Sequence, residues 1–242
     1  MIDTLVAGAA DVLTVDDPLE AELFGATFLA AGDLAGEGFA EALTEGIVPA
    51  VAEAGTAESL ALLIALDAVG DVPEAAAAAV RLAGAGVPKP GWADELREPM
   101  RVGPCRRFAD TDESASMLVC SFDRGGRSHG FVLQADHTDC DAAVDILLVP
   151  GEALDEVVEA MRAEGQRAGV TVTEEELDPG EFRWQVERAL AARAVHDRED
   201  GAELPDDDED DDGPGYPTLA ALFRARMRVL PEPSRPPAPH GD

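Results

Sequence analysis

The densest group of possible metal ligands in this sequence is the segment 136–141, which reads DHTDCD. Oxygen ligands from a tight loop can bind a divalent cation, and an imidazole can add a nitrogen ligand. The candidate metal ligands are therefore Asp136, His137 and Asp139. Strand alternation nevertheless places His137 and Asp136 on opposite faces, so the alternative is a polar turn with His137 at the edge of the core.

A second acidic turn contains Asp110, Asp112 and Glu113. Paired with the first turn, it could form a two-metal site of the kind that hydrolyses phosphate esters. A nucleic-acid substrate would need a basic surface, and only Arg106 and Arg107 lie nearby in the sequence. A metal-dependent hydrolase is therefore the alternative function and not the favoured one.

The three cysteines, Cys105, Cys120 and Cys140, are spaced 15 and 20 residues apart, without the close pair typical of zinc sites. Together with His129 or His137 they leave zinc binding or a cysteine nucleophile as further alternatives. Cys120 alternates with apolar residues, so we expect it to be a small buried side chain. Such a small, odd number of cysteines is typical of a reducing compartment.

The strands expected to position these residues begin near Met100, where the apolar pattern takes a period of two. Gly125-Gly126 is a two-residue hairpin signal. Further strands are expected at 101–109 and 143–149, followed by a helix at 151–168. The hairpin turn and the apolar pattern predict the same register, which pairs Phe122 with His129, Cys120 with Phe131, and Leu118 with Leu133.

The preceding part of the chain has helical periodicity instead. Asp17 and Thr56 are expected to cap helices, Gly32 to end the first of them, and Pro73 to open a later one. Pro49 predicts a kink or break in the helix around it. The fold class is therefore α+β, in which an N-terminal helical bundle precedes a small antiparallel meander sheet covered by helices.

The chain of 242 residues contains 50 acidic and 18 basic residues, for a net charge of −32. This charge argues against general binding of nucleic acids and against an anionic membrane surface. The longest strictly apolar run, 60–66, is too short to span a membrane, and the N-terminus lacks the basic region of a secretory signal. We therefore expect a cytoplasmic protein.

The charge also indicates the domain organisation. Residues 1–91 hold 15 acids and 2 bases, and residues 197–212 hold 11 acids and 1 base. The acidic run at 197–212 repels itself and buries nothing, which predicts disorder in that segment. The expected parts are an acidic helical domain at 1–91, an α+β domain at 92–196, a disordered acidic linker at 197–217, an amphipathic helix at 218–230, and a disordered proline-rich tail at 231–242.

The C-terminal helix carries an apolar stripe that is the candidate partner-binding surface. Its members are Leu219, Leu222, Phe223 and Met227, and arginines lie between them. Two alternatives stay open for this helix. It folds back onto the acidic body of its own chain, or it lies in a groove on another subunit or partner.

Four segments resemble an uncharacterised family of actinobacterial proteins. They are residues 101–108, 116–122, 130–138 and 219–231, and the similarity is expected to cover most of the chain, although these motifs are not chemically specific. Residues after Thr138 depart from the glycine-containing segment of that family. The resemblance implies a bacterial cellular setting and no particular reaction.

The sequence favours a non-enzymatic cytoplasmic interaction protein whose acidic surface binds a basic protein partner. A specific form of this hypothesis is a DNA mimic that blocks a nucleic-acid-handling protein. No cofactor is expected for this function. A divalent metal belongs only to the alternative hydrolase.

Overall fold

The computed structural model describes residues 6–34, 36, 38–167, 169–199 and 213–237. The chain divides into two compact units. The first contains residues 1–98 and 206–225, and the second contains residues 99–205 and 226–242. Among the described residues, no helix combines the length and the apolar character that crossing a membrane requires.

The first unit is helical. Asp17 accepts a hydrogen bond from the backbone N–H of Leu19 at 2.9 Å, and Thr56 accepts one from Ser59, so both predicted N-caps are confirmed. Gly32 does not end the first helix, which runs on to Leu34. The helical elements are η1 (Asp11–Leu13), α2 (Pro18–Leu34), α3 (Phe39–Glu41), η2 (Ala42–Ile47), α4 (Val48–Ala54), α5 (Ala57–Gly70), α6 (Pro73–Gly84), η3 (Gly91–Ala93) and η4 (Glu95–Arg97).

The predicted irregularity at Pro49 takes the form of a π-helical segment, η2, that ends just before α4. Proline has no N–H to donate to the carbonyl four residues earlier, and its ring crowds that carbonyl. The backbone widens by one residue per turn over 42–47 and then resumes as an α-helix. The chain therefore changes its helical pitch here without breaking.

The division between the units falls after Glu98, whereas the sequence placed a domain boundary after Gly91. Trp92 explains the difference. It is 1% exposed, packs with Val12, Ala21 and Ala61, and donates from its indole N–H to the carbonyl of Val12 at 2.7 Å. The segment after Gly91 thus contributes to the core of the first unit.

The second unit is built on an antiparallel sheet in the order β5-β4-β3-β2-β6, with β1 also paired to β3. Gly125 and Gly126 both have positive φ, as a two-residue hairpin turn requires, and all three predicted pairs of the β3–β4 register are confirmed. The strands are β1 (Arg101–Val102), β2 (Arg106–Asp110), β3 (Ala115–Arg124), β4 (Arg127–Asp136), β5 (Ala142–Pro150) and β6 (Val172–Glu176).

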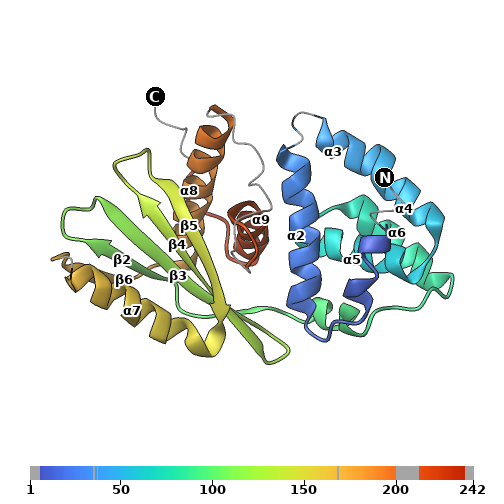
Figure 1. Cartoon of the computed structure of the whole chain (residues 1–242), viewed down its shortest axis with the longest axis horizontal. Helices are drawn as coiled ribbons and strands as arrows, with labels where there is room; N and C mark the ends of the chain where they lie inside the picture. Colours follow the sequence, from blue (N-terminus) through green and yellow to red (C-terminus); the bar gives the residue numbers. More distant parts are fainter. Residues whose placement is uncertain (1–5, 35, 37, 168, 200–212, 238–242) are drawn as a thin grey trace. The chain divides into compact units, whose positions relative to one another are not determined.

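Two helices cover opposite faces of this sheet (Figure 1). After η5 (Gly151–Ala153), α7 (Leu154–Arg167) buries Leu154 and Val158 against Val119 and Val132. Leu154 comes so close to the strand that a Cβ on Gly130 would lie 2.7 Å from its methyl groups. The opposite face lies towards α8 (Pro179–Glu199). It carries Leu118 and Phe131, which alternate along their strands with Val119 and Val132. The α+β class predicted from the sequence is confirmed.

Two strand predictions are corrected. The single strand expected at 101–109 is interrupted between β1 and β2. Gly103 still donates to the carbonyl of Ser121 at 2.8 Å, but Pro104 has no N–H with which to continue the ladder. The short strand β6 was not predicted. Its sequence, VTEEE, has one half-buried residue followed by four exposed ones, and so gives almost no apolar alternation.

The predictions for the C-terminal region are corrected in part. Helix α8 extends through 197–199, and α9 runs over Tyr216–Met227 and so begins before 218. Residues 231–237 are not a detached tail, because Trp184 of α8 donates to the carbonyl of Pro236 at 2.9 Å and Arg235 pairs with Glu181. The predicted disorder of 200–212 and 238–242 lies outside the described residues.

Candidate functional site

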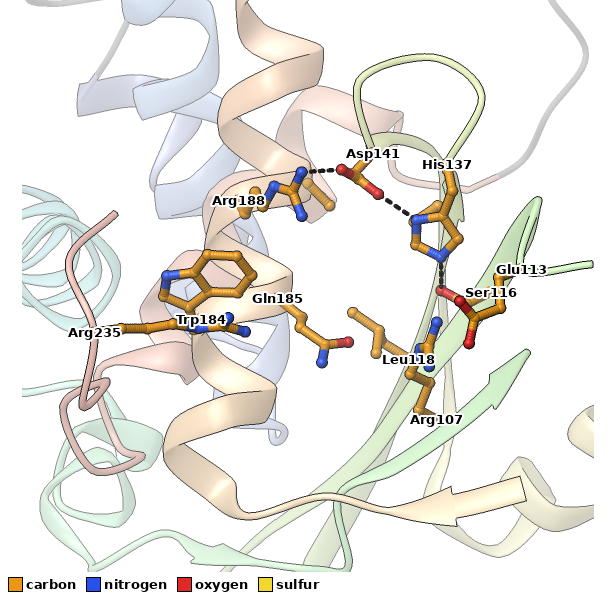
Figure 2. A pocket seen from close by; sticks show the side chains of 12 residues that line it. Arg107, Glu113, Ser116, Leu118, His137, Asp141, Trp184, Gln185, Arg188 and Arg235 are labelled. Carbon is orange, nitrogen blue, oxygen red and sulfur yellow. Dashed lines mark hydrogen bonds and ion pairs between the residues drawn. The ribbon is translucent and has the colours of Figure 1, made fainter. Parts of the chain in front are cut away.

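A cavity of about 360 Å³ lies in the second unit between the sheet and α8 (Figure 2). Strand β2 contributes Arg107, β3 contributes Ser116 and Leu118, and the turn after β4 contributes His137 and Asp141. From the other side come Trp184, Gln185, Arg188 and Ala189 of α8 and Arg235 of the C-terminal segment, and Glu113 and Ala135 complete the lining.

A hydrogen-bonded chain of polar side chains crosses one wall of the cavity. His137 Nε2 lies 2.9 Å from Ser116 Oγ, and His137 Nδ1 contacts Asp141, whose other oxygen is paired with Arg188 (Figure 2). Because a carboxylate only accepts, the neutral ring carries its proton on Nδ1, and Nε2 accepts from the Ser116 hydroxyl. These hydrogen bonds and the ion pair fix the orientation of the imidazole and connect the β4–β5 turn to α8.

This order of hydrogen bonds is the one by which a histidine activates a serine nucleophile. The position of Ser116 differs, however, from that of a serine nucleophile, which its substrate must be able to reach. Ser116 is 5% exposed and lies in an inner strand, paired on one side with Ala109 and on the other with Ala135. Its backbone N–H therefore belongs to the sheet ladder and does not point at a reacting carbonyl. The arrangement fits binding better than acyl transfer.

Two arginines lie against the ring of Trp184. The guanidinium carbon of Arg235 is 3.4 Å from the ring centroid and that of Arg188 is 5.3 Å away. Arg235 is also paired with Glu181, one turn before Gln185 on the same helix. Cation–π contacts and ion pairs of this kind fix the positions of both guanidinium groups on the α8 side of the cavity.

Arg107 differs from the other two arginines. Its Nε atom is buried and, within the described part of the chain, finds no hydrogen-bond partner. It lies opposite Leu118 in the β2–β3 register, which directs its side chain to the face that lines the cavity. A buried guanidinium donor without an acceptor is costly, so an oxygen acceptor placed against this atom would be favourable.

The three predicted metal ligands do not converge. Both nitrogens of His137 are engaged in the cavity wall, and Asp136 accepts from the backbone N–H and the hydroxyl of Thr138 at 2.8 and 2.7 Å. These bonds lower the pKa of Asp136, the side-chain bond most of all. Asp139 lies instead with Cys140 and His196. Alternation along β4 and the turn that follows separate the predicted set.

The second acidic turn is also used structurally. Asp110 accepts hydrogen bonds from the hydroxyl and the backbone N–H of Ser114, and the hydroxyl bond lowers its pKa. Asp110 and Asp136 both line a second, more apolar cavity of about 610 Å³ on the α7 side of the sheet. In the described ranges, however, neither belongs to a cluster of three possible metal ligands. Both carboxylates instead accept hydrogen bonds from residues of their own turns.

The four predicted partner-binding residues of α9 are all buried. Leu222, Phe223 and Met227 are fully covered, and Leu219 is 6% exposed. Thr218, at the start of the helix, contacts Thr27 of α2 at 3.3 Å within the first unit. The four side chains would have to leave these positions to reach another protein, so partner binding through them stays a prediction.

Sequence reasoning missed most of the cavity. Ser116 shares the face of Leu118, so the predicted β3–β4 register contained the signal for it. Arg107 lies in β2, whose pairing with β3 was not predicted. Trp184 and Arg188 lie one turn apart on α8, and sequence reasoning did not place either of them beside the sheet in a cavity. Nothing in the sequence indicated that Arg235 lies against Trp184.

No protein-family model, curated protein or solved structure matches this chain. The resemblance to actinobacterial proteins therefore stays a prediction.

Proposed function

We propose that the second unit binds a small molecule carrying a carboxylate or a phosphate in the arginine-lined cavity. The observation that carries this proposal is the buried Nε of Arg107, which has no acceptor among the described residues. An unpaired buried donor costs about 1–3 kcal/mol. A ligand oxygen placed against it would remove that cost and accept a charge-assisted hydrogen bond.

The charges around the cavity support an anionic ligand. Arg107, Arg188 and Arg235 line it, against the acids Glu113 and Asp141. Asp141 already pairs with Arg188, and Glu181 already pairs with Arg235. These pairs hold two guanidinium groups in place, and the unpaired Nε of Arg107 is a donor that a ligand oxygen can use. The volume of about 360 Å³ is at the small end of the range for metabolite sites.

Isothermal titration calorimetry with succinate and with inorganic phosphate tests this proposal and distinguishes the two anion types. We expect one of them to bind, and Arg107→Gln to weaken it by about tenfold or more, equivalent to about 1.4 kcal/mol. Arg167→Gln is the matched control, because it removes an exposed arginine of α7 outside the cavity. Equal binding by both variants, or binding of neither anion by the unaltered protein, would contradict the proposal.

We also propose that the acidic surface of the first unit binds a basic protein. A separate observation favours this. The exposed acids of its described residues include Asp11, Asp16, Glu20, Glu41, Glu45, Glu53, Asp71, Glu74, Asp94 and Glu98. Between residues 6 and 98 the bases are Arg81, Lys89 and Arg97, and the last two pair with Asp94.

An arginine-rich peptide labelled with a fluorophore tests this second proposal. Binding should weaken steeply with salt, because exposed charges are screened within about 8 Å at physiological ionic strength. Replacing Glu41, Glu45 and Glu53 by glutamine should weaken binding. Replacing Glu152, Glu156 and Glu164 of the second unit should not. Displacement of the peptide from DNA by this protein would support the DNA-mimic form, and salt-independent binding would contradict the proposal.

A further inference from the structure

We infer that Asp139, Cys140 and His196 form a zinc site at the end of the sheet where the β4–β5 turn meets α8. One carboxylate oxygen, the thiol sulfur and one imidazole nitrogen lie within 4.8 Å of one another. The site shares no residue with the arginine-lined cavity, and so it is independent of the proposed anion binding.

The distances are close to those of a tetrahedral site. Zinc binds nitrogen and oxygen at about 2.0–2.2 Å and sulfur at about 2.3 Å, so neighbouring ligand atoms lie about 3.3–3.8 Å apart. His196 Nδ1 is 3.5 Å from Asp139 Oδ2, which matches this spacing. The remaining pairs need to close by no more than about 1.5 Å to reach that geometry. Asp139 and Cys140 are exposed side chains, so such a movement displaces no core packing.

The ligand types select the metal. A thiolate with an imidazole favours zinc over magnesium and calcium, which prefer oxygen ligands alone. Three protein ligands leave a fourth tetrahedral position for water. Cys140 is the exposed cysteine of the chain, whereas Cys105 and Cys120 are buried. It is therefore the thiol that a metal ion can reach from solvent.

The two segments that supply the ligands are held together independently of any metal. Arg193 of α8 donates to the carbonyls of Ala143 and Val144 at 3.2 and 3.1 Å, and Arg188 pairs with Asp141. His196 follows Arg193 by three residues, so both lie on the same side of the helix. Contacts at the end of the turn and at the start of β5 thus hold α8 near the turn, which lowers the entropy cost of binding a zinc ion between them.

Titration of the full-length, reduced protein with Co²⁺, followed by displacement with Zn²⁺, tests the site. A thiolate ligand gives a charge-transfer band in the near ultraviolet, and a tetrahedral site gives strong visible d–d bands. Carboxylates elsewhere in this acidic chain give neither feature, so the spectrum separates the site from adventitious binding. Because the thiol releases a proton on binding, affinity should rise with pH.

We expect one equivalent of Co²⁺ to produce both bands and Zn²⁺ to abolish them. Cys140→Ala should remove the charge-transfer band, and His196→Gln should weaken binding by at least about 100-fold, the upper end of the cost of losing even an outer partner. Asp136→Asn, in the same acidic segment, is the control and should bind normally. An absent charge-transfer band, or one that persists in Cys140→Ala, would overturn the proposal.

Discussion

The sulfur atoms of Cys105 and Cys120 lie 3.7 Å apart in the second unit, on segments joined through the β1–β3 and β2–β3 pairings. Both thiols are free and buried. Their mutual contact lowers the pKa of Cys105 and, together with burial, raises that of Cys120. Cys105 is therefore the thiol of this pair that more readily becomes a thiolate.

We predict that diamide oxidises this pair to an intramolecular disulfide, in which the two thiols lose two hydrogens and diamide is reduced. The rate should rise with pH as the thiolate fraction of Cys105 grows. Mass spectrometry of peptides should find the Cys105–Cys120 link, and Cys140→Ser should leave it unchanged. If only Cys140 is oxidised, the two thiols are not in contact in solution.

The cluster beneath α7 should dominate the stability of the second unit. Phe108 is 1% exposed, packs with Val119 and Leu154, and lies under the guanidinium groups of two arginines. Phe108→Ala should lower the free energy of unfolding by about 3–5 kcal/mol. Val144→Ala, at a position 53% exposed, should change it by less than about 0.5 kcal/mol. Urea unfolding of both variants measures the difference, and similar values would contradict this packing.

Asp110 should titrate differently once Ser114 is removed. Since folding lowers the pKa of Asp110, the carboxylate stabilises the fold above its unfolded pKa, and this contribution is lost as pH falls through the folded pKa. Ser114→Ala removes the largest cause and should raise the folded pKa. Carbon NMR of the carboxyl groups follows the titration. Asp136, whose lowered pKa depends on Thr138, is the internal control. An unchanged midpoint for Asp110 would show that Ser114 has no such role.

Local signals predicted much of the fold, because each depends on neighbours in the chain. The caps at Asp17 and Thr56 and the register around Gly125-Gly126 need only short-range geometry and one apolar face. The sequence could not place Arg235 on Trp184, since that contact joins segments 51 residues apart with no shared pattern. The same holds for His196 beside Asp139, a pairing that depends on where α8 crosses the sheet.

The most direct test of the anion-binding cavity is the NMR signal of the Arg107 Nε–H group, assigned by its loss in Arg107→Gln. Adding succinate or phosphate should shift this signal and slow its exchange with water, because the ligand oxygen becomes the missing acceptor. The control signal is that of Arg167, which lies outside the cavity and should not move. A saturating anion that leaves the Arg107 signal unchanged would contradict the proposed function.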